Sequence, residues 1–460
     1  MLRNPLFIRF GTITLLTLVF LVPLSMVRGV ITERDLYLQS AVYDIAASWT
    51  GPQRVVTPIL VIPFTENYEE TIWDKRKNTY VSVKKTRVGH KTFMPAALDV
   101  DATIATELRR RGIYSVPVYH SNFKITGRFA PPNLKTAIQS DRGELTWGQP
   151  RLVLGLADTR GIGADPRLVM QSESQSFEPG TRLASLGTGI HAPLTNIDLD
   201  QPLPFELSLA VRGSQRVHIA PVAQDASIHV TADWPHPKFN GRFLPTTREI
   251  SSDGFDASWR VSAFSTDANE FLARCDINEC GDFESLLLGV DLIESVDLYT
   301  RADRATKYGI LFVLLTFVAF FLTETLTSKR LHPVHYTLVG ATLAMFYLLL
   351  ISLAEHIGFN VAYALATSAC CALIGSYLTA VLASRKLAAV YAGAIAVLYG
   401  MLFLILRSED AALLMGSLLL FMLLAIVMLS TRRIEWTETA LAMRHRQRGG
   451  TADDLSPTER

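Results

Sequence analysis

The sequence predicts a multi-pass α-helical membrane protein that carries a large, predominantly β periplasmic domain after its first transmembrane helix. Three observations predict this fold class. The 460 residues are 49 % hydrophobic, and the mean hydropathy of +0.23 is above that of most soluble domains. Uncharged apolar runs lie at the start of the chain and again in its last third. No long apolar run lies between them, before Tyr308.

The composition also limits the classes of function. The net charge is +1, from 44 basic and 43 acidic residues, which gives no indication of a nucleic-acid partner. The four cysteines are too few for a disulfide framework, and their spacing does not fit a structural zinc site. No GxSxG, HExxH or Walker A pattern occurs, so we assign no catalytic residue, no metal and no cofactor.

The first apolar run, residues 10–27, follows Arg3 and Arg9. A secretory signal would have a similar pattern, but its exit should carry small residues at a cleavage site, and PLSMVRGV does not. The run is near the length of about 17–25 residues that crosses a bilayer core. We therefore favour an uncleaved anchor, residues 1–27, whose basic start stays in the cytoplasm.

Residues 28–305 form the predicted periplasmic domain, and their sequence pattern is typical of a β protein. Short strands are expected at residues 57–64, 113–118, 123–129, 152–156, 205–211 and 227–232, punctuated by Gly, Pro and Asp. One segment, from Leu98 to Leu108, fits a period of two residues. An amphipathic helix that ends at Arg111 and Gly112 competes with this strand.

Residues 218–264 are dense in Trp, Phe, Pro and Gly. Two interpretations are open. The block is either a ligand-binding face built on aromatic and imidazole side chains, or a β-rich core with its turns, since aromatic residues dominate cores. The residues of the possible face are Trp234, His236, Phe239 and Trp259. The histidines of the block lack the spacing of a metal site.

Cys275 and Cys280 enclose the short segment CDINEC in this exported region. The periplasm is oxidising, so a local disulfide is expected. Its loop is short, and its contribution to stability would be modest. Two unpaired thiols are the alternative.

Five further spans are predicted, at residues 308–323, 336–354, 357–384, 387–406 and 411–431, within a bundle of residues 306–431. With the anchor they make six. Basic pairs fall in alternate loops and place both termini in the cytoplasm, the last 29 residues, 432–460, being a polar tail.

Polar residues cluster at the ends of the spans. Arg301, Arg304 and Lys307 share one broad side of a helix, which rests on lipid head groups or forms a solvated stalk. The interfacial candidates are Glu324, Arg330, His332, Glu355 and His356. We expect Glu324 to pair with Lys329 or Arg330, and Glu355 to face head groups or the β domain. Carboxylates at opposite ends of antiparallel spans do not form a direct pair.

Several blocks resemble the CreD (Cet) family of bacterial inner-membrane proteins. They are VDLYTRADRATKYGILFVLLTF, FFLTETL, RLHPVHYTLVGATLAMFYLLLISLAEHIGFNVAY, RRRGIYSVPVY, and DWPHPKFNGRFLP followed by GFDASW. The family's usual serine after WPHP is replaced by Lys238. The resemblance implies a protein of envelope integrity under a two-component system, linked in some bacteria to the β-lactam response. It implies no catalytic residues.

Three functions therefore compete. The leading interpretation is a non-enzymatic envelope-integrity protein of the inner membrane, whose partners are the lipid bilayer and envelope proteins or cell-wall components. A transporter or channel with a periplasmic ligand-binding domain is the alternative, although ionisable residues gather at span ends rather than inside spans. A membrane enzyme is the third, and no motif supports it.

Overall fold

The computed structural model describes residues 5–74, 78–134, 143–183, 186–280, 283–292, 298–327, 332–408 and 412–432. They divide into two compact units. The helical unit comprises the segments Met1–Tyr37 and Val296–Arg460, and the β unit is Leu38–Ser295. The sequence predicted these boundaries at residues 28 and 305, where the first apolar run ends and shortly before the next one begins. The first boundary lies later in the structure because helix continues past the end of the first apolar run, as described next.

The N-terminal anchor consists of two nearly continuous helices, α1 (Pro5–Val19) and α2 (Leu21–Ser48). Pro23 explains the interruption at Phe20, because proline has no N–H and its ring clashes with the carbonyl four residues earlier, that of Val19. The helix does not stop with the apolar run at Val27. It continues through a charged segment to Ser48, which the loss of hydrophobicity alone did not predict.

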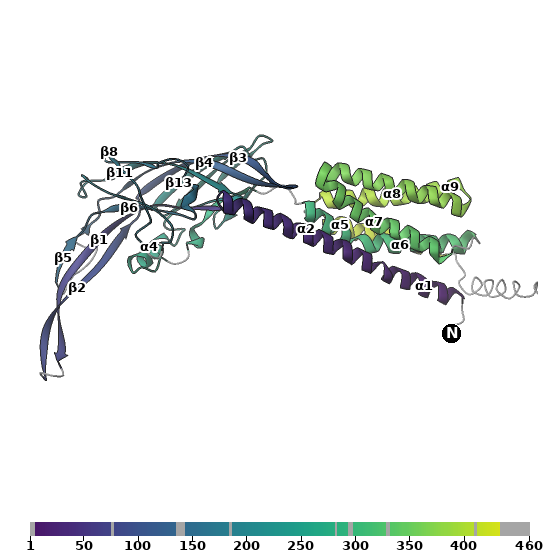
Figure 1. Ribbon diagram of the computed structural model, residues 1–460, viewed down its shortest axis with the longest axis horizontal. Coiled ribbons are helices and arrows are strands. Elements are labelled where there is room, and N and C mark those ends of the chain that lie inside the picture. Colours follow the sequence, from purple (N-terminus) through teal and green to yellow (C-terminus); the bar gives the residue numbers. More distant parts are fainter. Residues whose placement is uncertain are drawn as a thin grey trace, which may run out of the picture. The chain divides into compact units, whose positions relative to one another are not determined.

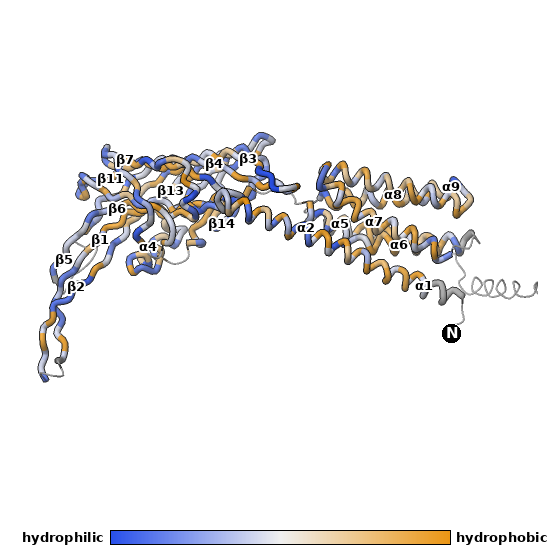
Figure 2. Tube along the Cα trace, viewed as in Figure 1, coloured by the Kyte–Doolittle hydropathy of each residue, from blue (hydrophilic) through white to orange (hydrophobic). Residues whose placement is uncertain are grey.

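The rest of the helical unit is α5 (Leu298–Lys307), α6 (Gly309–Thr327), α7 (Pro333–Ile357), α8 (Phe359–Leu382), α9 (Arg385–Arg407) and α10 (Ala412–Thr431). Figure 2 shows hydrophobic residues along α6 to α9. Among the described residues, five helices are long and apolar enough to span a membrane, one of them near the N-terminus. In α10 only the shorter apolar segment Leu414–Ile426 is found. The sixth span therefore stays a prediction.

Two sheets build the β unit, as the ribbon in Figure 1 shows. Within the described residues the nine-stranded sheet has the order β14-β17-β12-β1-β6-β10-β9, with β2 and β5 paired to β1. The eight-stranded sheet has the order β15-β16-β13-β3-β4-β11-β7-β8. The strands of the first sheet are β1 (Gln53–Asp74), β2 (Thr79–Phe93), β5 (Gly143–Trp147), β6 (Arg151–Leu156), β9 (Glu178–Pro179), β10 (Gly189–Pro193), β12 (Arg216–Ala220), β14 (Pro237–Gly241) and β17 (Leu288–Leu292). Those of the second are β3 (Ala97–Arg111), β4 (Tyr114–Phe129), β7 (Arg167–Met170), β8 (Glu173–Gln175), β11 (Leu203–Ser214), β13 (Asp225–Ala232), β15 (Thr247–Ile250) and β16 (Phe255–Ser262).

The ambiguous segment from Leu98 to Leu108 is a strand, part of β3. Its side chains alternate between buried and exposed, and Leu98, Val100 and Ile104 enter the main core. The competing helix does not form because the residues pair along their length with β4 and, in parallel, with β13. The two strands expected at residues 113–129 are one strand, β4.

One apolar core joins the inner faces of the two sheets. Val217 and Val290 contribute to it from the nine-stranded sheet, and Ile125, Leu207 and Ile228 from the other. Beyond this core, β1 and β2 continue as a paired hairpin that extends away from the rest of the unit (Figure 1). Because only one inner face of each sheet meets the other sheet, the outer face of the nine-stranded sheet does not contribute to this core.

Candidate functional site

Polar residues form a row across the outer face of the nine-stranded sheet. Arg54 on β1 lies opposite His218 on β12, His218 lies opposite Gly289 on β17, and Gly289 lies opposite Asn240 on β14. Residues opposite one another on neighbouring strands point to the same face. The intervening residues, such as Val217 and Val290, enter the core on the other side. The row is therefore fixed by strand register.

A second row lies two residues along the same strands, on the same face. Here Asp291 of β17 lies opposite Arg216 of β12 on one side and Lys238 of β14 on the other. His218 Nε2 is 2.8 Å from Asp291 Oδ1, and Asn240 Nδ2 donates to Asp291 Oδ2 at 3.2 Å. The Asp291 carboxylate thus joins the two rows.

Electrostatics at this carboxylate favour its charged form. Burial alone would raise the pKa of Asp291. Hydrogen bonds from His218 and Asn240, with the charge of Arg216, outweigh burial and hold the pKa below its ordinary value of 3.8. Both members of the His218–Asp291 pair are buried, at 8 % and 7 % exposure. The pair is the floor of the site.

A cavity of about 440 Å³ opens over this floor. It lies within the size range of small-molecule sites, about 300–1,000 Å³. The residues that line it come from the starts or ends of several elements: Pro52, Gln53, Arg54, Ala157, Arg216, His218, Asn240, Gly241, Glu284 and Leu287. Among them, Gln53 is committed to backbone groups, since its amide nitrogen donates to the carbonyl oxygens of Asp158 and Arg212.

The possible aromatic ligand face is part of the core instead. Trp234 and Trp259 are 8 % and 1 % exposed, and their indole N–H groups donate to the carbonyl oxygens of His236 and Phe243. Phe239 packs edge-to-face on Trp259 at 5.8 Å. Of the four predicted face residues only His236 is exposed. Alternation along β14 explains this result, because it directs Phe239 inward and Asn240 outward.

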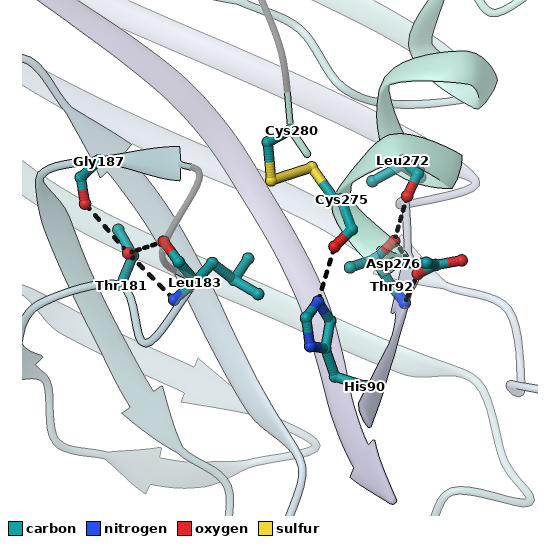
Figure 3. The surroundings of a disulfide bond; sticks show 9 residues. All are labelled: His90, Thr92, Thr181, Leu183, Gly187, Leu272, Cys275, Asp276 and Cys280. Atoms are coloured by element: carbon teal, nitrogen blue, oxygen red, sulfur yellow. Dashed lines mark hydrogen bonds between the residues drawn. A yellow bond between two sulfur atoms is a disulfide. The ribbon is translucent and has the colours of Figure 1, made fainter. Parts of the chain in front are cut away.

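Cys275 and Cys280 are joined in a disulfide at the end of α4 (Ala268–Asp276), shown in Figure 3. Both are buried in a second apolar cluster on the outer face of the nine-stranded sheet. The imidazole of His90, on β2, lies 2.7 Å from the carbonyl oxygen of Cys275. The disulfide therefore belongs to the attachment of α4 to the sheet.

In the helical unit, the Glu355 carboxylate has partners on two other helices. Its side chain is 7 % exposed, its Oε1 accepts a hydrogen bond from Tyr299 Oη at 3.2 Å, and it lies 3.7 Å from Arg34 Nε. Tyr299 belongs to α5 and Arg34 to the charged continuation of α2. The partner Arg34 was not predicted, because the anchor was expected to end at Val27 and Arg34 lies beyond it.

The three basic residues of α5 do not share one environment. Arg301 is directed at the bundle, with its guanidinium 5.7 Å from the centre of the Phe359 ring. Lys307 pairs with Asp303 at 2.8 Å, and Asp303 also pairs with Arg28 of α2 at 3.2 Å. Arg304 is half-buried. The three residues therefore have different partners, and their contact with lipid head groups stays a prediction.

The remaining interfacial candidates occupy the ends of helices. Glu324, on α6, is 8 % exposed, and its predicted partners Lys329 and Arg330 lie outside the described residues. His332 caps the N-terminus of α7, where its Nδ1 accepts from the Val334 N–H at 3.4 Å. His356 is exposed, with its Nδ1 3.0 Å from the Ser352 carbonyl oxygen.

Sequence reasoning missed the polar site on the sheet. A signal was present, since Arg216 and His218, and likewise Lys238 and Asn240, are spaced two apart in strand-like segments. These two pairs of residues come together only through the register in which β12, β17 and β14 pair. A pattern within one strand does not predict that register. Across the described ranges, no three histidine, cysteine or acidic side chains converge as a metal site would require.

The fold defines a multi-pass α-helical membrane protein with a large β unit inserted after its first membrane helix. Comparison with known proteins identifies the class further. The family model described as "Inner membrane protein CreD" matches residues 5–437. The chain is 36 % identical over 455 residues to the inner membrane protein CreD of Escherichia coli (strain K12), covering 99 % of both chains. The chain belongs to the CreD family of inner-membrane proteins.

Proposed function

We propose that this inner-membrane protein is non-enzymatic and supports cell-envelope integrity, with its β unit in the periplasm and both termini in the cytoplasm. The observation that carries the proposal is the Cys275–Cys280 disulfide, which lies in a β unit placed between two membrane helices. Disulfides persist in oxidising compartments such as the periplasm. The charge of the loops between the helices supports the same orientation.

Reporter fusions test the orientation. Fusions after Lys329, Arg385 and Arg460 should be active with a cytoplasmic reporter and inactive with one that needs export. A fusion within the β unit, after Arg248, should behave in the opposite way. An active periplasmic reporter at Arg460 would contradict a cytoplasmic C-terminus and reduce the number of spans to five.

Thiol labelling tests the compartment through the disulfide. In denatured, unreduced protein taken from cells, Cys275 and Cys280 should not react, and both should react after reduction. A Cys275→Ser variant is the matched control, since it must leave Cys280 reactive without reduction. Full labelling of both residues in unreduced wild-type protein would remove the main support for a periplasmic β unit.

The role in envelope integrity and the control by a two-component system extend what the family resemblance implies. A strain that lacks the protein should leak periplasmic enzymes and respond differently to β-lactams, and a plasmid copy should restore it. Expression should change when the sensor kinase is deleted. In-cell crosslinking from the β unit would identify envelope proteins or cell-wall components as partners. Normal leakage and β-lactam response in the deletion strain would refute the role.

A transporter is the second candidate, because Glu324 is 8 % exposed within a membrane helix. Buried ionisable residues in membrane helices commonly mark ion pathways. Proton or ion flux in proteoliposomes decides between the two. Flux that disappears in Glu324→Gln or Glu355→Gln would favour the transporter, and absence of flux favours the envelope role.

A further inference from the structure

We propose that the cavity on the outer face of the nine-stranded sheet binds a small ligand that carries a carboxylate or a phosphate. This proposal concerns the β unit alone and goes beyond the role in envelope integrity. The observation behind it is a cavity lined by two arginines and one glutamate beside a prearranged, buried polar floor. The chemistry of arginine decides the class of ligand.

The charges that line the cavity favour an anion. Arg54 has a counterion, because its Nη1 lies 3.7 Å from Glu284 Oε1, and its guanidinium also lies 5.2 Å from the centre of the Phe283 ring. The side chain of Arg216 makes no hydrogen bond and no ion pair within the part of the chain that the structure describes, although its charge acts on the neighbouring Asp291 carboxylate. Two arginines and one glutamate are the charged side chains among the described lining residues, so the lining itself carries one excess positive charge, with Asp291 beneath it.

An arginine is well suited to this task. The guanidinium carries its donors in a planar fork that matches the two oxygens of a carboxylate or a phosphate. The backbone of Arg216 is fixed, since its residue pairs with Asp291 in the sheet and its carbonyl oxygen accepts a hydrogen bond from Tyr119 Oη at 2.5 Å. The side chain thus projects from a rigid strand, which lowers the entropy that binding must overcome.

The floor of the cavity is held ready for a polar ligand. His218 Nε2 is occupied by Asp291, which leaves Nδ1 as the ring nitrogen without a partner among the described residues. Asn240 is oriented by two hydrogen bonds, one to Asp291 and one from the Gly241 N–H at 2.8 Å. The His218–Asp291 pair and the Asn240 amide therefore form a polar surface that is already in place before a ligand binds.

Gly289 lies between His218 and Asn240 in the first row. Its φ of +156° is rare for residues with a side chain. A Cβ added at Gly289 would lie 2.2 Å from the Val217 carbonyl oxygen and 2.9 Å from His218 Cδ2. A side chain at this position would therefore collide with β12, and glycine allows β17 to pair closely there between His218 and Asn240.

Binding fits the cavity better than catalysis. A His–Asp pair can activate a nucleophile as a general base. However, no serine, threonine or cysteine is among the described residues that line this cavity. The volume of about 440 Å³ suits a ligand of about the size of a monosaccharide.

The test uses full-length protein in detergent micelles and three probes that differ only in their charged group: glucose, glucuronate and glucose 6-phosphate. Binding is measured by isothermal titration calorimetry. At least one charged probe should bind saturably and glucose should not, because the sugar ring is common to all three. Binding of glucuronate only identifies a carboxylate ligand, and binding of glucose 6-phosphate only identifies a phosphate ligand.

Variants connect that binding to the cavity. Arg216→Gln should lower the affinity for the charged probe about tenfold, as expected for the loss of a charge-assisted hydrogen bond at a partly exposed site. His218→Gln, which keeps a polar side chain on the floor of the cavity, should also lower the affinity for the charged probe. Arg248→Gln is the matched control, since it removes an exposed arginine from β15 of the other sheet and should leave affinity unchanged.

Three results would overturn the proposal. They are no saturable binding of either charged probe at millimolar concentration, equal binding of glucose, and binding that Arg216→Gln and Arg248→Gln affect equally. The last would show attraction to the overall charge of the protein only. Circular dichroism of each variant confirms that it is folded before its affinity is interpreted.

Discussion

Asp276 should determine how firmly α4 is attached to the β unit. It is the last residue of this helix, a position where a negative charge is unfavourable because of the helix dipole. Its contacts with β2 explain why it is there. Oδ1 accepts hydrogen bonds from the backbone N–H and the hydroxyl of Thr92, both at 2.7 Å (Figure 3). Oδ2 pairs with Lys91.

The magnitude of an Asp276→Ala substitution follows from these contacts. The N–H of Thr92 would be left buried without its charged acceptor, which costs about 1.5–3 kcal/mol. The Thr92 hydroxyl loses less, since it can donate to the Leu272 carbonyl oxygen at 3.1 Å instead. The Lys91 pair is partly exposed and adds at most about 1 kcal/mol. The total is about 3 kcal/mol, or on the order of 100-fold in the equilibrium for local opening.

Amide hydrogen exchange of full-length protein, measured on peptides that cover α4, is the assay. Asp276→Ala should accelerate exchange in α4 on the order of 100-fold, because local opening controls the rate. Asp276→Asn should have a smaller effect, since its amide oxygen can still accept from Thr92. Glu270→Ala is the matched control on the same helix. It removes only an exposed ion pair with Arg274 and should change exchange about twofold. Equal rates in Asp276→Ala and Glu270→Ala would refute the reasoning.

Two further predictions concern the β unit. Hydrogen bonds with Asp101 and Asp256 raise the pKa of His229 above its ordinary value of 6.5, so the stability they contribute is full below pH 6.5 and is lost as the pH rises through the folded pKa. An NMR titration should show this raised pKa and its decrease in Asp256→Asn, and an unchanged pKa would contradict the assignment. Trp259→Ala should lower the free energy of unfolding by about 3–5 kcal/mol, since this side chain is 1 % exposed. Trp73→Ala, at 47 % exposure, should cost much less in the same denaturant titration, and similar losses would argue against burial of Trp259.

Patterns of hydrophobicity predicted the parts of the fold that depend on local sequence. The apolar runs located the membrane helices, because a bilayer requires continuous apolar segments. Period-two alternation identified β3, whose inward residues, such as Val100 and Ile104, are fully buried. In both cases, whether a residue contacts lipid, core or solvent depends on its position within one helix or strand. The local sequence pattern is therefore enough to predict it.

The polar sites could not be predicted from the local sequence, because they are formed by residues that lie far apart in the chain. The aromatic block was correctly noticed, but Trp234 and Trp259 turned out to be core residues, while the neighbouring polar positions face outward. The cavity needs the register of strands that are far apart in sequence. The partner of Glu355 required a helix that continues beyond the apolar run, to Arg34, and no hydrophobic signal marks such a continuation.

The pairing of β1 has a consequence for the order in which the chain folds. The Thr57 hydroxyl bonds to the carbonyl oxygen of Ala220, 163 residues later, beside the parallel pairing of β1 with β12. β12 in turn needs β17, which ends at Leu292, a short distance before α5 begins at Leu298. The nine-stranded sheet therefore cannot be completed until almost the whole β unit has been synthesised. Folds with such non-local pairing form slowly and expose unpaired strands meanwhile. During synthesis this protein therefore presents a long, incomplete sheet to whatever protects unfolded chains in its compartment.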